Sequence, residues 1–340
     1  MLPLTIYSLL FRVVVASSTA GISSPLNSEQ TSRPPLEAYF AVSCVSKDPY
    51  SSYECGEDAA GYAESGRFAA LAIADGLGGY SKSSGSGVLA SSMVERAVLC
   101  VANSSRLEES LALNTSALTS IVKESFVNSC PLKNGLSGAT TFSFGLIDLE
   151  TRELSTANLG DGVILVIRDG QVVFKTDVVQ ATFNAPAYFE YNADKSMFEN
   201  LLRVKDDMEH SQLSLVSLER GDIVIAGSDG LFDNLFDEEI TEIVVDELSR
   251  FSDHPIPDKA EKIAQRLKFT AYYFSRDIIV PPNQRPFFKA REEFIERCQS
   301  DRAACSPLDR FGFERTYPGY VQGQLGGKLD DISIIVGLFN

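Results

Sequence analysis

The sequence predicts an α+β protein in which antiparallel sheets are covered by helices. Short β-rich runs end in Gly or Asp turns, and helical stretches stand in groups between them rather than alternating with them one by one. Strict alternation is typical of parallel sheets, so the grouping favours antiparallel strands. Of the 340 residues, 44% are hydrophobic and 22% are charged, which provides for a large core and excludes wholesale disorder.

Strands are predicted where an apolar run stops at a turn. Residues 68–74 stop at Asp75-Gly76, and residues 222–226 run into a turn at 228–230. The pair Asp169-Gly170, between two further apolar runs, is the strongest hairpin signal in the chain. The other predicted strands are 140–148, 154–158, 163–168, 171–175 and 332–338.

Apolar residues at helical spacing predict four helices in what reads as one continuous domain, residues 36–340. Within that domain, residues 281–326 follow no regular period and are rich in Pro, Arg and Phe. We interpret them as an irregular insertion with one helix near 290–298. The four main helices are expected at 88–101, 118–126, 237–248 and 259–273.

The chain is strongly acidic, with 30 Lys and Arg against 46 Asp and Glu and a formal net charge of −16. Such a surface repels phosphate backbones and anionic lipid, so we expect neither nucleic acid nor a membrane surface as a partner. Two histidines exclude a three-histidine metal site, and no cysteines have the C-x-x-C spacing of a zinc or thioredoxin-type site. We expect the six cysteines to be mostly free thiols, with bridges only in a secreted chain.

Residues 1–35 are predicted to be a targeting or disordered segment outside the fold. The first 28 residues contain no acidic side chain, and residues 2–10 are mostly apolar. A secretory signal would use that run and a cut at 18–20 but lacks a basic start, whereas a transit peptide would need more arginines than Arg12 and Arg33. No uninterrupted run of 18 apolar residues occurs, so we expect no membrane span.

Acidic residues recur at the ends of predicted strands. Asp75, Asp161 and Asp229 each precede a glycine, Asp330 precedes another acid, and the pair Glu57-Asp58 stands before the first strand. A single Asp-Gly pair is commonly only a turn, but four strand-end acids in similar contexts indicate a cluster. Clustered carboxylates stay ionised only among cations, and all-oxygen sites suit Mg²⁺ or Mn²⁺. The residues alone therefore predict an oxygen-ligand metal site of a kind suited to hydrolysis.

The segment 75–79, Asp-Gly-Leu-Gly-Gly, resembles the D-G-x-G-G motif of the metal-dependent protein phosphatases of the 2C type. Residues 56–59 match that family's early acidic motif. Leu77 and the Phe-Asn-Ala-Pro stretch at 183–186 are most similar to the branch that includes mitochondrial members. The resemblance covers about residues 38–338, and the later motifs follow in the family's order at 138–141, 158–161, 228–233 and 327–332.

The resemblance implies a four-layer α-β-β-α sandwich, two antiparallel sheets with helices on the outer faces. It also implies hydrolysis of phosphoserine and phosphothreonine on proteins by a water that two Mn²⁺ or Mg²⁺ ions activate. The implied catalytic residues are Asp75, which bridges the ions, and Asp229, while Asp161 would help to bind a third, weaker ion. Glu57 and Asp58 would act directly or through water. The full set of implied metal ligands is Glu57, Asp58, Asp75, Gly76 (by its carbonyl), Asp161, Asp229 and Asp330.

Two positions depart from the family pattern. Many relatives carry His where this chain has Leu77, and a phosphate-clamping Arg where it has Tyr53. We therefore expect leaving-group protonation and phosphate clamping to differ, with Arg67 or Lys82 as candidate clamps. The alternative to an enzyme is a catalytically inactive phosphatase-like module that binds phosphoproteins or a partner, and a weaker alternative is a hydrolase of small phosphoesters.

The expected partner is a phosphoprotein substrate, and the expected state is a monomer. By resemblance we expect a mitochondrial or other organellar location, with the secretory pathway as the alternative.

Overall fold

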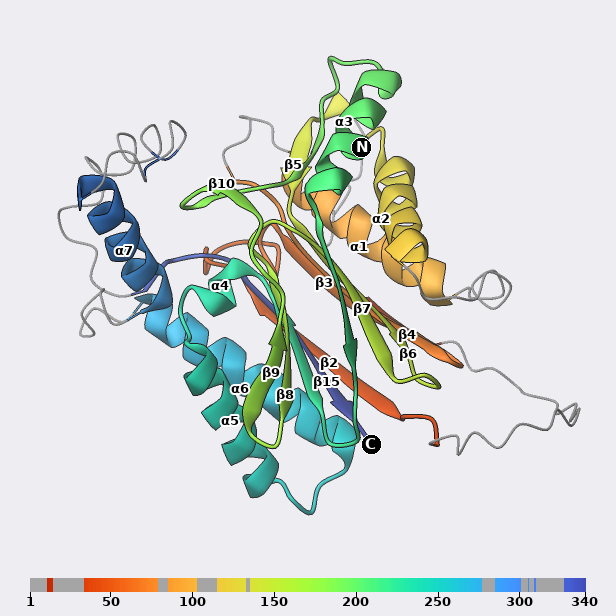
Figure 1. Cartoon of the computed structure of the whole chain (residues 1–340), viewed down its shortest axis with the longest axis vertical. Helices are drawn as coiled ribbons and strands as arrows, with labels where there is room; N and C mark the ends of the chain where they lie inside the picture. The colour runs from red at the N-terminus through yellow and green to blue at the C-terminus, as the bar shows by residue number, and fades with distance from the viewer. Residues whose placement is uncertain are drawn as a thin grey trace, which may run out of the picture.

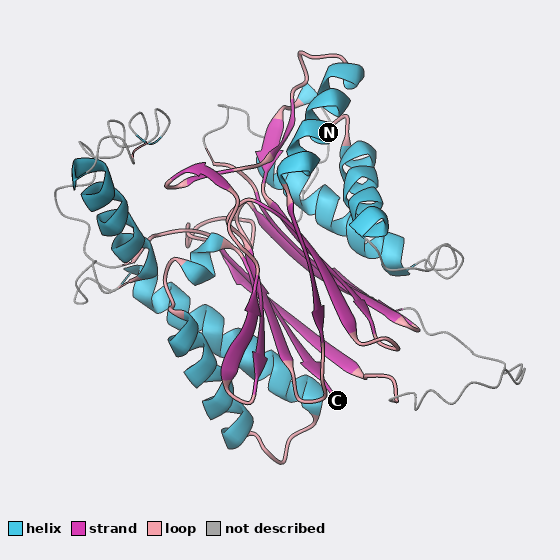
Figure 2. Ribbon diagram, viewed as in Figure 1, coloured by secondary structure: helices cyan, strands magenta, loops and turns pink. Residues whose placement is uncertain are grey.

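The computed structural model describes residues 11–14, 34–78, 85–102, 115–132, 135–276, 285–300, 305, 309 and 327–340. Two β-sheets pack face to face, and helices cover the outer face of each sheet (Figures 1 and 2). This arrangement confirms the predicted four-layer α-β-β-α sandwich of two antiparallel sheets.

The first sheet has six strands, and all neighbours in it are antiparallel except the first pair, which is parallel. That first strand comes from the segment 1–35, so these four residues extend the sheet although we expected the whole segment to lie outside the fold. The strand order is β1 (Phe11–Val14), β3 (Asp58–Ser65), β4 (Phe68–Asp75), β6 (Phe142–Asp148), β7 (Glu153–Leu159) and β13 (Gln212–Ser217).

The second sheet has five strands and is antiparallel throughout. Its order is β2 (Ala38–Val45), β15 (Ile332–Phe339), β14 (Ile223–Gly227), β8 (Val163–Arg168) and β9 (Gln171–Lys175). Two further pairs stand apart from the main sheets. They are β10 (Gln180–Thr182) with β11 (Ala185–Pro186), and β12 (Phe189–Tyr191) with β5 (Gly138–Thr140).

Helices cover the sheets on opposite sides of the molecule (Figure 1). On the first sheet lie α1 (Ser86–Ala102), α2 (Thr115–Ser129) and α3 (Met197–His210). On the second lie α4 (Asp229–Phe232), α5 (Asp237–Arg250) and α6 (Ile256–Arg276), and α7 (Pro286–Ser300) projects beyond them. The helix that we predicted within the insertion is thus longer than expected. None of the described helices is long and apolar enough to cross a membrane.

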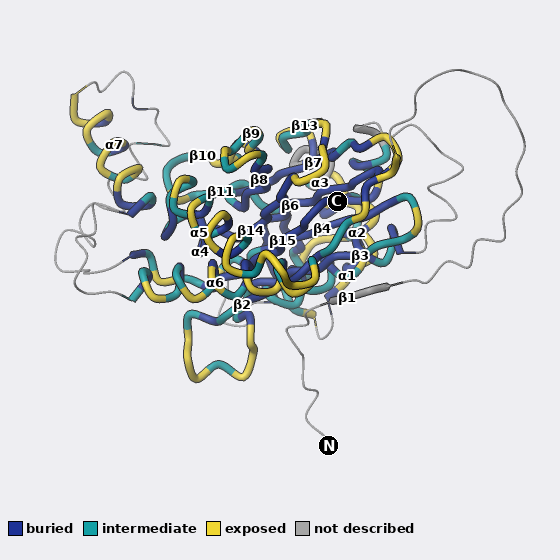
Figure 3. The backbone as a smooth tube through the Cα atoms, turned by 90° about the horizontal axis from the view of Figure 1, so that it is seen from below, coloured by how far each residue is buried: buried dark blue, intermediate teal, exposed yellow. Residues whose placement is uncertain are grey.

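Three buried clusters fill the three interfaces of the sandwich, and Figure 3 shows the central strands of the sheets as buried. Alternation along β4 explains how one strand serves two of these interfaces. Its larger residues Leu71 and Ile73 belong to the cluster between the sheets. Its alanines at 70, 72 and 74 belong to the cluster under α1, where their small size lets the helix approach closely.

The cysteine prediction was wrong, because two disulfides join four of the six cysteines. Cys44 on β2 pairs with Cys55, and their Cα atoms are 5.2 Å apart. Cys298 at the end of α7 pairs with Cys305 at a Cα distance of 5.0 Å. Both spacings suit a bridge, and they depend on the folded path of the chain, which the scattered cysteine positions do not reveal.

Candidate metal centre

The carboxylates of the first sheet lie together because of strand register. Asp75 is the last residue of β4 and Asp58 the first residue of the antiparallel β3, and the two are paired directly across the ladder. The motif at 138–141 holds Asp75 in place. The Thr141 hydroxyl accepts a hydrogen bond from the Asp75 amide at 3.1 Å, and the Thr140 hydroxyl donates one to the Asp75 carbonyl at 2.9 Å.

Two more acids lie just beyond the ends of strands in the second sheet. Asp229 begins α4, two residues after β14 ends, and Asp330 stands two residues before β15 begins. These two segments are tied together at Ser228, whose amide donates to the Ser333 carbonyl at 3.0 Å. Asp161 lies in the short link from β7 to β8, where the chain passes from one sheet to the other.

Three of these acids converge on one point. Asp75, Asp161 and Asp229 each offer a carboxylate oxygen, and these oxygens all lie within 4.8 Å of one another. The Oδ1 atoms of Asp161 and Asp229 are buried and have no hydrogen-bond partner among the described residues. Burial and then the neighbouring acids raise the pKa of Asp75 and of Asp229 well above its ordinary value, and burial raises that of Asp161 to about 6. A cation placed beside such groups favours their ionised form.

Gly76 and Glu57 bring the backbone of the early acidic motif to the same place. The Gly76 amide donates to the Glu57 carbonyl at 3.2 Å. A Cβ on Gly76 would lie only 2.8 Å from that carbonyl oxygen and from the Gly87 nitrogen, so no other residue fits. Burial, followed by repulsion from Asp331, raises the pKa of Asp58 to about 8.

Asp331 has a role that sequence reasoning missed. Its side chain is buried and accepts hydrogen bonds from the Lys47 amide at 2.7 Å, the Glu57 amide at 3.0 Å and the Ser46 hydroxyl at 3.2 Å. It therefore anchors both ends of the loop that leads from β2 to Glu57. Its position directly after Asp330 in the last motif was the available signal.

Two lysines were also missed. Lys328 forms an ion pair with Asp229, and its Nζ lies 2.8 Å from an Asp233 oxygen and 3.3 Å from an Asp330 oxygen. Lys47 places its Nζ 3.0 Å from the other Asp330 oxygen. Asp330 is thus beside the cluster but held between two ammonium groups. Lys328 stands inside the motif at 327–332, whereas nothing in the sequence around Lys47 marks it.

The candidate clamp Arg67 lies away from this centre. It follows β3 in the tight turn to β4, and its guanidinium binds Asp148, which is paired with the first residue of β4, Phe68. Asp75 is at the other end of that strand. The second candidate, Lys82, is outside the described residues.

The insertion and the Phe-Asn-Ala-Pro stretch meet at the edge of the acid cluster. The Phe183 ring packs on Phe287 and Phe294 of α7, with ring centroids 5.1 and 5.5 Å apart. The Phe287 amide donates to the Asp233 carbonyl at 3.2 Å, and its ring lies 5.2 Å from the Lys328 Nζ. Helix α7 is therefore fixed to the residues that surround Lys328.

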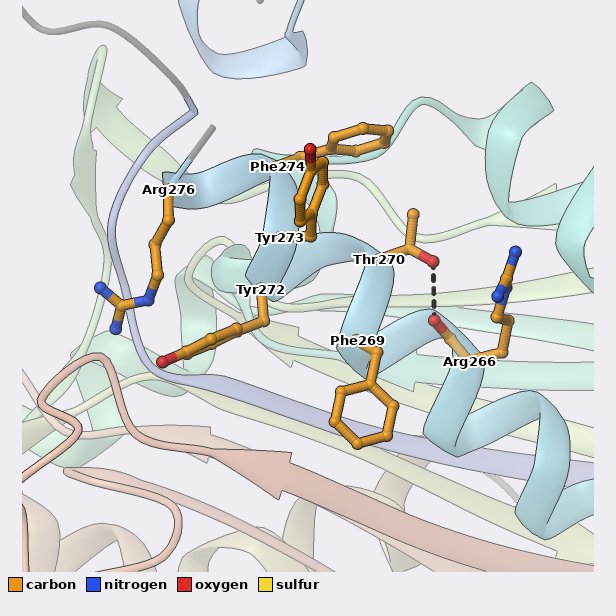
Figure 4. Close-up of a pocket in the computed structure, with 7 residues that line it drawn as sticks. All are labelled: Arg266, Phe269, Thr270, Tyr272, Tyr273, Phe274 and Arg276. Atoms are coloured by element: carbon orange, nitrogen blue, oxygen red, sulfur yellow. Dashed lines mark hydrogen bonds between the residues drawn. The ribbon is translucent and has the colours of Figure 1, made fainter. Parts of the chain in front are cut away.

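A separate hollow of about 580 Å³ lies along the second half of α6, and all the side chains drawn in Figure 4 come from that helix. None of the acids described above lines it. It is connected to the site through Arg276, whose guanidinium binds the Lys47 carbonyl. The lining residues are Arg266, Phe269, Thr270, Tyr272, Tyr273, Phe274 and Arg276.

The fold and the order of the motifs define a known class of protein. A family model for protein phosphatase 2C matches residues 49–268, so the chain belongs to the protein phosphatase 2C family, as its resemblance indicated. The structure also matches the X-ray structure of the photosystem II phosphatase PBCP. The match covers 89% of this chain and 98% of that chain, with a TM-score of 0.60 and 22% sequence identity, which shows a shared fold.

Two relatives illustrate how far the sequence likeness extends. The probable protein phosphatase 2C 55 of Arabidopsis thaliana is 33% identical over 191 residues, which is 56% of this chain and 31% of that protein. The protein phosphatase PTC7 homolog of Xenopus laevis is 29% identical over 221 residues, 65% of this chain and 61% of that protein. The matches thus span less than two thirds of either relative.

Proposed function

We propose that this chain is a metal-dependent phosphatase that hydrolyses phosphoserine and phosphothreonine on proteins. The observation that carries the proposal is the convergence of Asp75, Asp161 and Asp229 from the strand ends of both sheets. Hard divalent ions such as Mn²⁺ and Mg²⁺ prefer carboxylate and carbonyl oxygens, which are the donors gathered here.

The residues present fit a pair of such ions. Two buried carboxylate oxygens of the cluster lack a partner among the described residues, and the backbone at Gly76 admits no side chain. Asp75 would bridge the ions, the Gly76 carbonyl and Asp229 would complete their attachment, and Asp161 would help to bind a third, weaker ion. Asp330 would bind an ion once its carboxylate is released from Lys47 and Lys328. Glu57 and Asp58 would hold the ions directly or through water. When bound, the ions supply an activated water and positive charge against the phosphoryl oxygens.

Several residues of the chain fix the backbone around the metal centre, and two others exclude a role that their positions have in relatives. Asp331 fixes the loop before Glu57, and the Thr140 and Thr141 hydroxyls fix the backbone of Asp75. Leu77 has no titratable group, so protonation of the leaving alkoxide does not come from that position. Tyr53 is 39% exposed and carries no charge, so phosphate is not clamped there as by an arginine.

An inactive phosphatase-like module that binds phosphoproteins or a partner is the second candidate, and one observation favours it. Lys328 and Lys47 already neutralise part of the acid cluster without any metal ion. A module of this kind would keep the fold and lose the need for ions. Metal-dependent turnover therefore separates the two candidates.

We place the chain in an organelle, because it resembles the branch with mitochondrial members, and keep the secretory pathway as the alternative. Disulfides persist in oxidising compartments such as the secretory pathway, so the bridges Cys44–Cys55 and Cys298–Cys305 favour the secretory alternative. N-terminal sequencing of the mature protein decides: a cut near Ala20 indicates secretion, and a later cut with organellar recovery indicates import.

The test of activity uses the full chain and a phosphothreonine peptide. We expect phosphate release with Mn²⁺ or Mg²⁺, none with a chelator, and none from an Asp229→Asn variant of unchanged circular dichroism. Asp237→Asn is the matched control, since it removes the same charge from an exposed pair with Lys175 and should keep activity. Turnover that persists in chelator would refute the metal-dependent mechanism.

A further inference from the structure

The acids of the centre divide into two groups by their contacts with lysine. Among the described residues, Asp75, Asp58 and Asp161 form no ion pair, although Asp75 and Asp161 belong to the converging set. Asp229, Asp233 and Asp330 surround a single ammonium, that of Lys328. This second group therefore already has a positive charge of the chain's own among its carboxylates.

Lys328 is held firmly at both its backbone and its side chain. Its carbonyl accepts a hydrogen bond from the buried Asn234 side chain at 2.9 Å, and the preceding Gly327 amide donates to the Phe274 carbonyl at 2.8 Å. Its side chain is 14% exposed, and the Phe287 ring covers it at 5.2 Å from Nζ. An ammonium so enclosed, with three carboxylate partners, is a fixed charge of the site rather than a mobile surface group.

We propose that the Lys328 ammonium takes the place of a third metal ion, so that this chain's centre is complete with two ions. The inference rests on the proposed function, and it replaces the weaker third ion that the family resemblance implies at Asp161. The ammonium already occupies the position between Asp229 and Asp233, and an Asp161 carboxylate oxygen lies within 4.8 Å of an Asp229 oxygen. A third divalent ion there would have to displace it or lie against it, and like charges at such distances repel strongly. The two remaining ions fall to the side of Asp75, which pairs with no lysine among the described residues, and Asp229 keeps its Oδ1 for them because Lys328 pairs with its Oδ2.

The experiment counts bound ions in the full-length chain by equilibrium dialysis against Mn²⁺ and mass spectrometry of the metal. We expect two ions per wild-type chain and three per Lys328→Gln chain, because the substitution vacates a position among three carboxylates. Lys328→Arg keeps the charge and should keep the count at two. Lys175→Gln, which removes a lysine from one exposed pair with Asp237, is the matched control and should also bind two.

The outcomes distinguish this inference from the proposed function. A wild-type count of three, or an unchanged count in a folded Lys328→Gln variant, overturns the inference and leaves the phosphatase standing. A wild-type count of zero overturns the proposed function and the inference with it.

A second readout does not depend on turnover. Three carboxylates without their lysine repel one another, so Mn²⁺ should raise the melting temperature of Lys328→Gln more than that of the wild type. If Lys328→Gln does not fold, the Asp233→Asn variant tests the inference instead. The inference requires Asp233→Asn to bind two Mn²⁺ ions per chain, as the wild type does, and a lower number of bound ions overturns it. The double variant Lys328→Gln/Asp233→Asn should bind fewer ions than Lys328→Gln alone.

Discussion

The two ends of β4 carry acids in opposite electrostatic states. At its start, Asp148 of the neighbouring β6 receives two 2.9 Å hydrogen bonds from the Arg67 guanidinium and others from the Glu150 and Thr151 amides. These partners outweigh burial and lower the pKa of Asp148. At its end, Asp75 faces other acids, and burial with their repulsion raises its pKa. One end therefore stabilises the fold, while the other holds charge that an added cation must offset.

The largest expected effect is on Asp75→Asn. Loss of the shared carboxylate should reduce phosphate release by about 10³-fold or more, since outer-shell changes alone cost roughly 10- to 100-fold. In chelator at pH 7.5 the same variant should be more stable than the wild type, because an acid that its neighbouring carboxylates repel is gone. Urea unfolding and phosphate release measure the two effects, and lower stability in chelator would contradict this account of Asp75.

Asp148→Asn tests the other end. It leaves Arg67 without its buried partner, and we expect a loss of about 2–3 kcal/mol in the free energy of unfolding. Activity per folded molecule should be retained. Glu150→Gln is the control, because this acid also contacts Arg67, at 3.3 Å, but is 56% exposed and should cost under about 1 kcal/mol. Equal losses in the two variants would show that burial of the pair is unimportant.

The smallest effect is a pH dependence of opposite sign at the two ends. Asp161 and Asp58 have pKa values raised to about 6 and about 8, so the metal-free fold binds more protons than the unfolded chain between pH 8 and 5. The metal-free fold should therefore become more stable as the pH falls from 8 to 5. Asp148, whose pKa is lowered, contributes stability above the unfolded value near 4 and loses it as pH falls further.

Urea midpoints of the metal-free chain at pH 8, 6.5, 5 and 3 test these signs. Asp58→Asn should flatten the gain from pH 8 to 5 and leave the loss at pH 3. Saturating Mn²⁺ should remove the gain, because bound ions keep the carboxylates deprotonated. A wild type that is most stable at pH 8 in chelator would contradict the raised pKa values.

Much of the fold was predictable because it depends on local pattern. Apolar runs that stop at Asp-Gly turns located β4, β8 and β14, and helical spacing located α1, α5 and α6. The strands β2 and β13 and the helix α3 were not predicted, since their alternation is weak or their polar content high. The strand-end acids followed from the same turns, and Asp75, Asp161 and Asp229 do converge in the structure.

The parts that were missed depend on contacts between distant residues. Lys328 meets Asp229 across 99 positions, and Asp331 meets Glu57 across 274. The pairing of Cys44 with Cys55 likewise follows from the path of the loop after β2. No local pattern encodes such neighbours. The choice of ligands among the acids remains a prediction.

The link that carries Asp161 joins two strands of different sheets, while Asp75 ends a strand of the first sheet and Asp229 follows a strand of the second. The opening available to ions is consequently set by the thickness of the sandwich. Side chains such as Leu71 and Ile164, packed between the layers, act as spacers for it. A substitution that leaves a cavity between the sheets would let the two sheets move closer together. We expect this to weaken ion affinity, although no ligand residue has been changed.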